Sequence, residues 1–190
     1  MLTTLFIDLN AYFASVEQQL RPELRNRPVA VLPVMADTTC CIAASYEAKR
    51  FGIKTGAMVS KAKQLCPELA LVEARPQIYT KFHHRIMAAV ETCIPVRSIH
   101  SIDEFSCRLA PNEREAEQAV ALALRIKDAI QTTIGPCIRC SIGLAPNRFL
   151  AKVGTDMQKP DGLVVIERRD LPDKLHGLEL IDLPGIGPRM

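Results

Sequence analysis

Apolar and polar residues alternate along this chain in short blocks, and the spacing changes repeatedly between strand-like and helix-like. Residues 2–9 form an apolar run interrupted by Asp8, which predicts a buried strand. Residues 11–20 carry apolar side chains at helical spacing before Arg21 and a proline, which predicts a helix. The chain is therefore expected to begin with a strand followed directly by a helix.

Similar blocks continue as far as residue 166. Strand-like runs cover residues 29–34, 40–45, 69–72, 96–101, 104–109, 139–145 and 163–166. Helix-like runs cover residues 46–51, 60–65, 78–94, 113–133 and 146–157. The clearest amphipathic segment is residues 113–133, and its apolar side is expected to consist of Ala116, Val120, Ala123, Leu124 and Ile130.

The order of these elements predicts the α+β class: a mainly antiparallel sheet covered by helices. Residues 11–75 contain only short elements and stand between the first strand and the remaining ones. They are therefore expected to form an insertion, which makes the core domain discontinuous in sequence.

The composition is that of an ordinary soluble protein with a hydrophobic core. The 190 residues are 48% hydrophobic and 24% charged, with a formal net charge of +3, which is too small to indicate a nucleic-acid partner by itself. A run of basic residues without an intervening acid contains Lys49, Arg50, Lys54, Lys61 and Lys63. Such a run forms either a solvated face or a phosphate-facing surface.

No apolar run approaches the ~18 residues that a membrane-spanning helix requires. The first eight residues lack a basic leader and already contain Asp8, unlike a signal peptide. We therefore expect a cytoplasmic protein with no membrane partner.

The cysteines are odd in number and lie mostly in apolar stretches, which favours free, buried thiols. The seven positions are 40, 41, 66, 93, 107, 137 and 140. Cys137 and Cys140 have CxxC spacing, but no second pair of cysteines or histidines accompanies them. A zinc or redox role is therefore disfavoured.

Three carboxylates occupy the ends of apolar strands. Asp8 lies near the end of the first strand, and Asp103 and Glu104 lie where two later strands meet. Converging carboxylates repel one another unless a cation lies among them, and oxygen-only ligands suit Mg²⁺ or Mn²⁺. The pattern indicates either a two-metal site for phosphoryl transfer or three unrelated exposed acids at strand ends.

Four segments and a tail resemble, in order, the motifs of Y-family (translesion) DNA polymerases, with the DNA polymerase IV branch as the nearest match. They are FIDLNAYFASVE at residues 6–17, AASYEAKRFGIK at residues 43–54, SIDE at residues 101–104, SIGLAPNRFLAK at residues 141–152 with KPDG at residues 159–162, and LPGIGP at residues 183–188. Each motif alone is weakly specific, but five in one order are highly specific.

The resemblance implies a discontinuous palm over residues 1–10 and 76–166, with fingers over residues 11–75. Residues 167–190 would begin a helical thumb at its helix–hairpin–helix. Because the family continues into a little-finger domain, the chain resembles a palm and fingers fragment of a longer protein, with weak or no activity of its own. A sliding clamp would bind through the part that is missing.

The implied activity is template-directed addition of deoxynucleotides to a primer 3′ end during bypass of DNA damage. The partners would be primer–template DNA and deoxynucleoside triphosphates, and the cofactor two Mg²⁺ ions, with Mn²⁺ as a substitute. Two alternatives remain open: a non-catalytic DNA-binding relative, and another palm-type nucleotidyl transferase or cyclase.

The resemblance also assigns roles by position. Asp8, Asp103 and Glu104 would be the catalytic metal ligands, helped by the backbone carbonyl of Leu9. The nucleotide would contact Asn10, Ala11, Tyr12, Phe13, Tyr46, Lys49 and Lys159, with Phe13 as the steric gate that excludes a 2′-hydroxyl. Gly185 and Gly187 would let the backbone approach a DNA phosphate.

Several positions depart from the family pattern without removing a metal ligand. Asn10 stands where many relatives have Asp, and Lys49 stands where Arg is common. Lysine keeps the charge but not the bidentate geometry of arginine, so we expect weaker nucleotide binding. Ala43, at a frequent hydroxyl position, removes a possible phosphate hydrogen bond and leaves a roomier site that would tolerate lesions.

Overall fold

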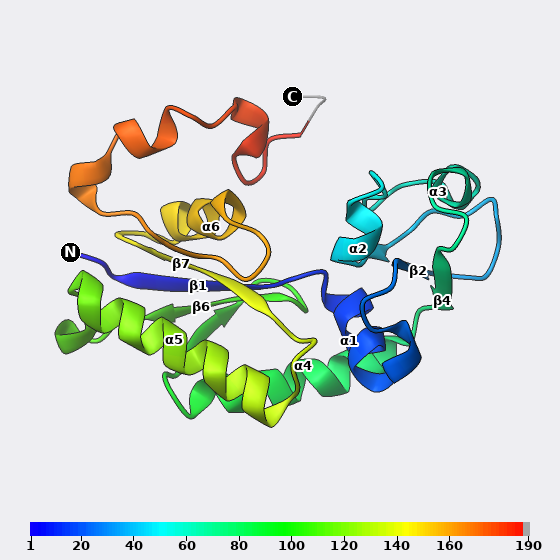
Figure 1. The fold of residues 1–190 in the computed structure, drawn as a ribbon. Coiled ribbons are helices and arrows are strands. Elements are labelled where there is room, and N and C mark those ends of the chain that lie inside the picture. The colour runs from blue at the N-terminus through cyan, green and yellow to red at the C-terminus, as the bar shows by residue number, and fades with distance from the viewer. Residues whose placement is uncertain (188–190) are drawn as a thin grey trace. The chain divides into compact units, whose positions relative to one another are not determined.

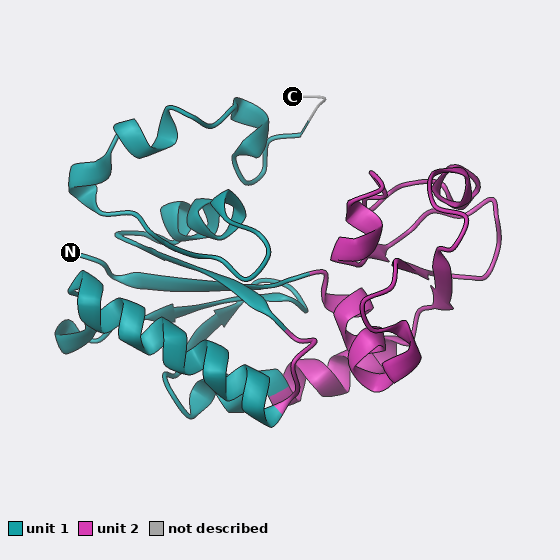
Figure 2. Ribbon diagram, viewed as in Figure 1, with its two compact units in different colours: residues 1–10, 86–133, 139–190 teal, residues 11–85, 134–138 magenta. Residues whose placement is uncertain are grey.

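The computed structural model describes residues 1–187 and contains two sheets with helices packed on them (Figure 1). The expected α+β class is confirmed. The chain divides into two compact units, which Figure 2 colours separately. Unit 1 contains residues 1–10, 86–133 and 139–190, and unit 2 contains residues 11–85 and 134–138. The last three residues of unit 1 and of the expected thumb lie outside the described residues.

Unit 1 is built on a five-stranded sheet of order β5-β6-β1-β7-β8. Its central strand β1 (Thr4–Leu9) pairs antiparallel with β6 (Glu104–Arg108) and β7 (Cys140–Ala145). The edges are β5 (Val96–Ile99), antiparallel to β6, and β8 (Leu163–Val165), parallel to β7. Because β1 has neighbours on both sides, five of its six residues are buried.

The helices α5 (Ala116–Thr133) and α6 (Arg148–Met157) lie on opposite faces of this sheet (Figure 1). Residue 143 is a glycine where α6 meets β7. A Cβ atom there would lie 1.9 Å from the backbone oxygen of Ala151. The absence of a side chain at Gly143 therefore permits the close approach of the helix to the sheet.

The buried side of α5 differs from the expected one. It consists of Ala119, Leu122, Ala123, Ile126 and Ile130, whereas Leu124 is 53% exposed. The expectation for Leu124 was wrong because a helical repeat rich in alanine and leucine offers two adjacent stripes. Packing against the sheet, which the repeat does not reveal, selects one of them.

Unit 2 has a three-stranded sheet of order β3-β2-β4, with bounds Ala43–Ala44, Val29–Leu32 and Ala70–Glu73. Its helices are α1 (Tyr12–Leu20), α2 (Tyr46–Lys49) and α3 (Val59–Leu65). A core of small and aliphatic side chains joins the sheet to α2 and α3, and it includes Leu32, Ile53 and Val59, all fully buried. The longer helix α4 (Pro76–Glu91) contributes residues to both units.

The described part of the C-terminal segment forms three short 3₁₀ helices instead of longer α-helices. They are Arg168–Asp170, Asp173–Leu175 and Leu180–Asp182. Leucines of this segment pack on the apolar cluster of α6 that contains Phe6 and Leu150. No helix within residues 1–187 is both long and apolar enough to span a membrane.

Candidate active site

Asp8 is a buried carboxylate at the end of β1. The neighbouring strand β6 begins at Glu104, and Asp103 directly precedes it. The register of the sheet pairs Asp8 with Glu104. The backbone N–H of Leu9 donates to the backbone oxygen of Asp103 at 2.9 Å. The two acidic segments, far apart in the sequence, therefore meet at one end of the β1–β6 ladder.

Two lysines from the last part of the chain supply the positive charge at this end. Lys152 Nζ lies 2.6 Å from Asp8 Oδ2 and 2.9 Å from Glu104 Oε1. Lys159 Nζ lies 2.8 Å from the same Asp8 oxygen, and both lysines also contact Asp156. The cost of burying the Asp8 carboxylate is therefore offset by two ammonium groups.

The electrostatic balance at Lys152 favours its charged form. Burial lowers the pKa of the Lys152 ammonium, but the charge of Asp8 and the hydrogen bonds to Asp8 and Glu104 outweigh this effect. The net result is a pKa above the ordinary value for lysine. Lys152 therefore acts as a fixed cation shared by two of the three expected metal ligands.

The partner of the Asp103 carboxylate is a serine, whereas Asp8 and Glu104 contact Lys152. The Asp103 carboxylate accepts a hydrogen bond from the Ser101 hydroxyl in the loop before β6. Within residues 1–187, no group of three acidic, histidine or cysteine side chains is arranged to hold a metal ion. The structure thus brings Asp8 and Glu104 to a common cation, and joins Asp103 to them through the backbone of Leu9.

The oxygen donors of this site fit a hard divalent cation. Asp8 and Glu104 already converge on one cation, the Lys152 ammonium, which stands in for a metal ion between their oxygens. Carboxylate oxygens are the ligands that Mg²⁺ and Mn²⁺ prefer. The donor set therefore suits the expected cofactor, with Lys152 in competition for the same oxygens.

Asn10 holds the turn that carries Lys159. The buried Asn10 amide donates from Nδ2 to Ser141 Oγ at 3.1 Å and accepts from the Asp161 N–H at 2.7 Å. Ser141 Oγ also accepts from the N–H of Gly162 at 3.2 Å. A carboxylate at position 10 could not donate to Ser141, so the amide suits this support of the turn.

The nucleotide-contact candidates of the first helix lie in unit 2. Ala11 adopts a left-handed conformation, with φ 47° and ψ 45°, immediately before α1. Tyr12 is buried, and its hydroxyl donates to the backbone oxygen of Tyr79 at 2.7 Å. The Phe13 ring stacks on Tyr79 with a centroid distance of 4.5 Å and an interplanar angle of 17°.

Tyr79 is itself held by a buried carboxylate. Its hydroxyl donates to Glu17 Oε1 at 2.9 Å, and Arg75 forms a 2.6 Å ion pair with Glu17. Burial raises the pKa of the Tyr79 phenol well above its ordinary value, and the Glu17 charge adds to the rise. The phenol therefore stays protonated and keeps its ring fixed behind Phe13.

The remaining candidates lie on short elements. Tyr46 and Lys49 belong to α2, where Lys49 Nζ lies 4.3 Å from the centre of the Tyr46 ring. Gly185 has a φ of 90°, in the left-handed region that favours glycine. Built Cβ atoms at Gly185 and Gly187 would have no neighbour within 4 Å, which leaves the backbone there accessible.

Several residues of these networks were not assigned a role from the sequence, among them Glu17, Tyr79, Ser141 and Lys152. Lys152 and Asp156 are spaced four apart on α6, so helical spacing alone could have paired them. The other contacts join residues more than sixty or one hundred positions apart, and no local pattern indicates such pairs.

Three comparisons with known proteins agree with one another. The model of the impB/mucB/samB family matches residues 7–156. A DNA polymerase IV from Moorella thermoacetica is 40% identical over 188 residues, which is 98% of this chain and 46% of the relative.

Solved structures give the same picture. A Y-family DNA polymerase chimera has a TM-score of 0.87 and 33% identity, and the match covers 97% of this chain and 54% of the chimera. An insertion ternary complex of Dbh DNA polymerase has a TM-score of 0.88 and 33% identity, with 98% and 55% covered. The chain thus spans about half the length of the relatives that it matches.

Proposed function

This chain belongs to the impB/mucB/samB family, the Y-family DNA polymerases, and we therefore propose that it is the catalytic front part of a translesion DNA polymerase. Such an enzyme adds deoxynucleotides, as directed by a template, to a primer 3′ end past damaged bases in the cytoplasm. The observation that carries the proposal is the meeting of Asp8 with Glu104 at the end of the β1–β6 ladder.

Asp8, Asp103 and Glu104, with the carbonyl of Leu9, would hold two Mg²⁺ or Mn²⁺ ions. Such ions lower the pKa of an attacking hydroxyl and neutralise charge on the transferred phosphate and the leaving group. The register of the sheet, which pairs Asp8 with Glu104, supports this assignment. Asp8 and Glu104 lie on paired strands of the central sheet, which would hold their backbones in place during the reaction.

Other residues of the family motifs would position the nucleotide. Lys159 would leave Asp8 and neutralise the triphosphate, since a lysine near the transferred group stabilises its developing charge. Tyr46 and Lys49 would contact the same phosphates, and Asn10 and Ala11 would border the nucleotide. Tyr12 would fix the start of α1 through its hydrogen bond to Tyr79.

Phe13 would select the sugar. A rigid ring at the position of a 2′-hydroxyl clashes with that group and offers it no hydrogen bond. The stack on Tyr79 supports this assignment because it fixes the plane of the ring.

We assign the palm to residues 1–10 and 76–166, the fingers to residues 11–75 and the thumb start to residues 167–190. Gly185 and Gly187 would accept a DNA phosphate at backbone N–H groups. A sliding clamp would bind a part of the protein beyond this chain.

Primer extension tests the proposal directly. Loss of a residue that only supports the ligands of a metal site lowers activity roughly 10–100-fold. Asp103→Ala removes a proposed ligand and should lower primer extension by this chain in Mn²⁺ by more than that. Glu117→Ala, which removes an exposed acid on α5, is the control and should extend as the wild type does. Equal extension by the Asp103→Ala and wild-type chains would rule out the site. DNA binding without primer extension by the full-length protein would favour a non-catalytic relative.

A further inference from the structure

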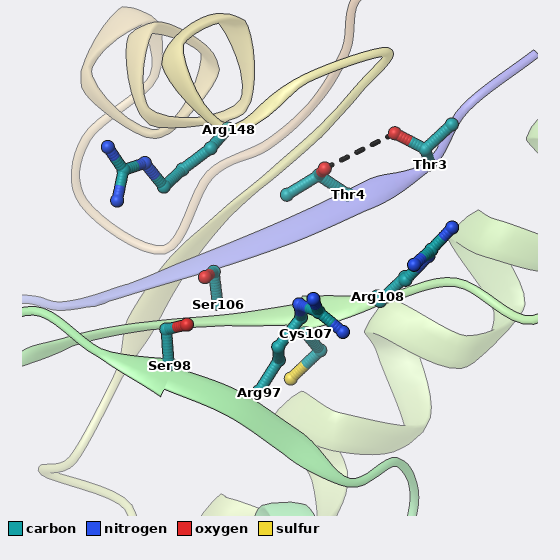
Figure 3. Close-up of a pocket in the computed structure, with 8 residues that line it drawn as sticks. All are labelled: Thr3, Thr4, Arg97, Ser98, Ser106, Cys107, Arg108 and Arg148. Atoms are coloured by element: carbon teal, nitrogen blue, oxygen red, sulfur yellow. Dashed lines mark hydrogen bonds between the residues drawn. The ribbon is translucent and has the colours of Figure 1, made fainter.

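A pocket lies on the sheet of unit 1, and none of the three acids lines it. It has a volume of about 410 Å³. Its lining comes from the start of β1, from β5 and β6, and from the first residue of α6, as Figure 3 shows. The lining residues are Thr3, Thr4, Arg97, Ser98, Ser106, Cys107, Arg108 and Arg148.

The chemistry of this arginine pocket suits an anion. Arg97, Arg108 and Arg148 bring three guanidinium groups to it, and no carboxylate is among the lining residues. Within residues 1–187, none of the three forms an ion pair with an acid. Three like charges at one pocket repel one another unless an anion lies among them, and guanidinium groups match phosphate oxygens in geometry.

Two local features direct arginines to the pocket. The pairing of β5 with β6 shifts between Val96 and Ser98, and such a bulge re-aims the side chain of the extra residue, here Arg97. Arg148 is the first residue of α6, and this position brings it to the pocket. The preceding residue, Asn147, is the N-cap, and its side chain accepts a hydrogen bond from the Leu150 N–H. Thr4, Ser98 and Ser106 also line the pocket and bring hydroxyl groups to it.

The register of the sheet relates this pocket to the acids. β1 pairs Asp8 with Glu104, and it pairs Thr4 with Arg108. Residues two or four apart on a strand point to the same face, and four residues span about 13 Å at about 3.3 Å each. The arginine pocket therefore opens on the same face as Asp8 and Glu104, about 13 Å along the strands.

Phe6 lies on β1 between Thr4 and Asp8, on the same face as both, and Lys152 Nζ lies 5.9 Å from the centre of its ring. His100 stacks on Phe6 with a centroid distance of 5.0 Å and shares a 2.9 Å hydrogen bond with Ser106. Burial and the nearby charge of Arg148 lower the pKa of His100, against a smaller opposing effect of Glu104.

We propose that the arginine pocket binds a backbone phosphate of the primer strand, upstream of the primer end that reacts at Asp8 and Glu104. The inference rests on the proposed function, which places the primer 3′ end at the acids. One DNA strand carries a phosphate about every 3.4 Å along the helix axis, so 13 Å corresponds to about four nucleotides. The pocket holds the primer strand by phosphate contacts and reads no sequence.

The test measures the affinity of the chain for a labelled primer–template as a function of salt. Each of Arg97→Gln, Arg108→Gln and Arg148→Gln should weaken binding several-fold at low salt. The triple variant should reduce the slope of log affinity against log salt by about 0.9 for each phosphate that the chain no longer neutralises. The matched control is Arg125→Gln, an exposed arginine of α5 on the other face, which should change affinity less than two-fold.

Neutral methylphosphonate linkages in the DNA locate the contact. Placed at the third to fifth linkages from the primer 3′ end, they should lower the DNA affinity of the wild-type chain as much as the triple substitution does. They should not lower the DNA affinity of the triple variant further. Unchanged affinity of the triple variant, or a weakening caused only by linkages in the template strand, would overturn the inference.

Three outcomes separate this inference from its premise. If the wild-type chain binds primer–template and the triple variant loses affinity for free deoxynucleoside triphosphate instead, the pocket is a nucleotide site and the inference is wrong. If the wild-type chain binds no primer–template, the proposed function falls together with the inference. If the triple variant binds DNA normally, the proposed function stands, and an acidic segment of protein becomes the remaining occupant.

Discussion

Phe13 and Tyr79 form a stacked pair in which only Phe13 carries the expected role. Tyr79 is almost fully buried, and Glu17 and Tyr12 fix it from two sides through its hydroxyl and its backbone oxygen. The plane of the Phe13 ring is therefore determined by its neighbour. We infer that Tyr79 is a positioning residue for the exclusion of ribonucleotides.

Removal of the ring behind Phe13 should relax this selection. Tyr79→Leu should lower the preference for deoxynucleotides over ribonucleotides by about 10-fold, which corresponds to ~1.4 kcal/mol. Tyr79→Phe keeps the stack, loses only the hydrogen bond to Glu17, and should preserve the preference. The readout is the ratio of kcat/KM for the two nucleotides in primer extension. Equal ratios for Tyr79→Leu and the wild type would remove Tyr79 from the selection of the sugar.

Lys152 competes for the oxygens that the proposed metal ions need. Lys152→Met should lower the thermal stability of the metal-free chain, because Asp8 and Glu104 lose their shared cation. Removing one partner of a buried pair costs ~3–5 kcal/mol, and we expect less here because Asp8 keeps Lys159. The same variant should bind Mn²⁺ more tightly than the wild type in a calorimetric titration.

Lys81→Met, at an exposed position of α4, is the control for the loss of one lysine. It should change neither the stability nor the Mn²⁺ affinity. Weaker Mn²⁺ binding by Lys152→Met would mean that Lys152 supports the metal site and does not compete with it.

Sequence patterns indicated candidate site residues, but they did not indicate which side chains contact them. Asp8, Asp103 and Glu104 could be selected as candidates because converging carboxylates favour a cation among them and because the family motifs contain them. Lys152, in contrast, meets Asp8 across 144 positions, and a lysine on a helix has no local feature that reveals such a contact. In the sequence, Asn10 is a departure from the family pattern. In the structure, its amide supports the turn that carries Lys159.

At the level of elements, the contact of α6 with β7 depends on a glycine. Gly143→Ala would place a Cβ atom 1.9 Å from the Ala151 backbone oxygen, so the helix must move away from the sheet. Overpacking of this kind costs ~1–3 kcal/mol. Chemical denaturation should show that loss of stability for Gly143→Ala. It should show almost none for Gly177→Ala, since a Cβ at Gly177 meets no atom within 4 Å. An unchanged midpoint for Gly143→Ala would contradict the close packing described above.

Most elements could be located from the hydrophobic pattern, and their ends less well. The expected run at residues 139–145 became β7, which begins at Cys140, and the expected helix at residues 113–133 became α5, which begins at Ala116. The prediction of the buried face of α5 was wrong for Leu124, because Leu122 and Leu124 both fit the helical repeat. Only packing against the sheet determines which of the two is buried. The order of strands in the sheet has no local signal at all.

At the scale of the whole chain, distant segments build the central sheet. β1 lies between β6 and β7, which begin about one hundred and one hundred and thirty positions later. Pattern analysis could place an insertion at residues 11–75 but could not derive this pairing. The expected family rested on five motifs in order, and it is confirmed by the match over residues 7–156.

The central claim is that Asp8, Asp103 and Glu104 hold divalent cations together. Mn²⁺ binding to the chain, followed by electron paramagnetic resonance of the free ion, tests it without requiring turnover. Asp8→Asn, Asp103→Asn and Glu104→Gln should each weaken Mn²⁺ binding by at least the roughly 10-fold that loss of a supporting residue costs, whereas Glu117→Gln should not. Wild-type affinity in Asp8→Asn or in Asp103→Asn would contradict the account.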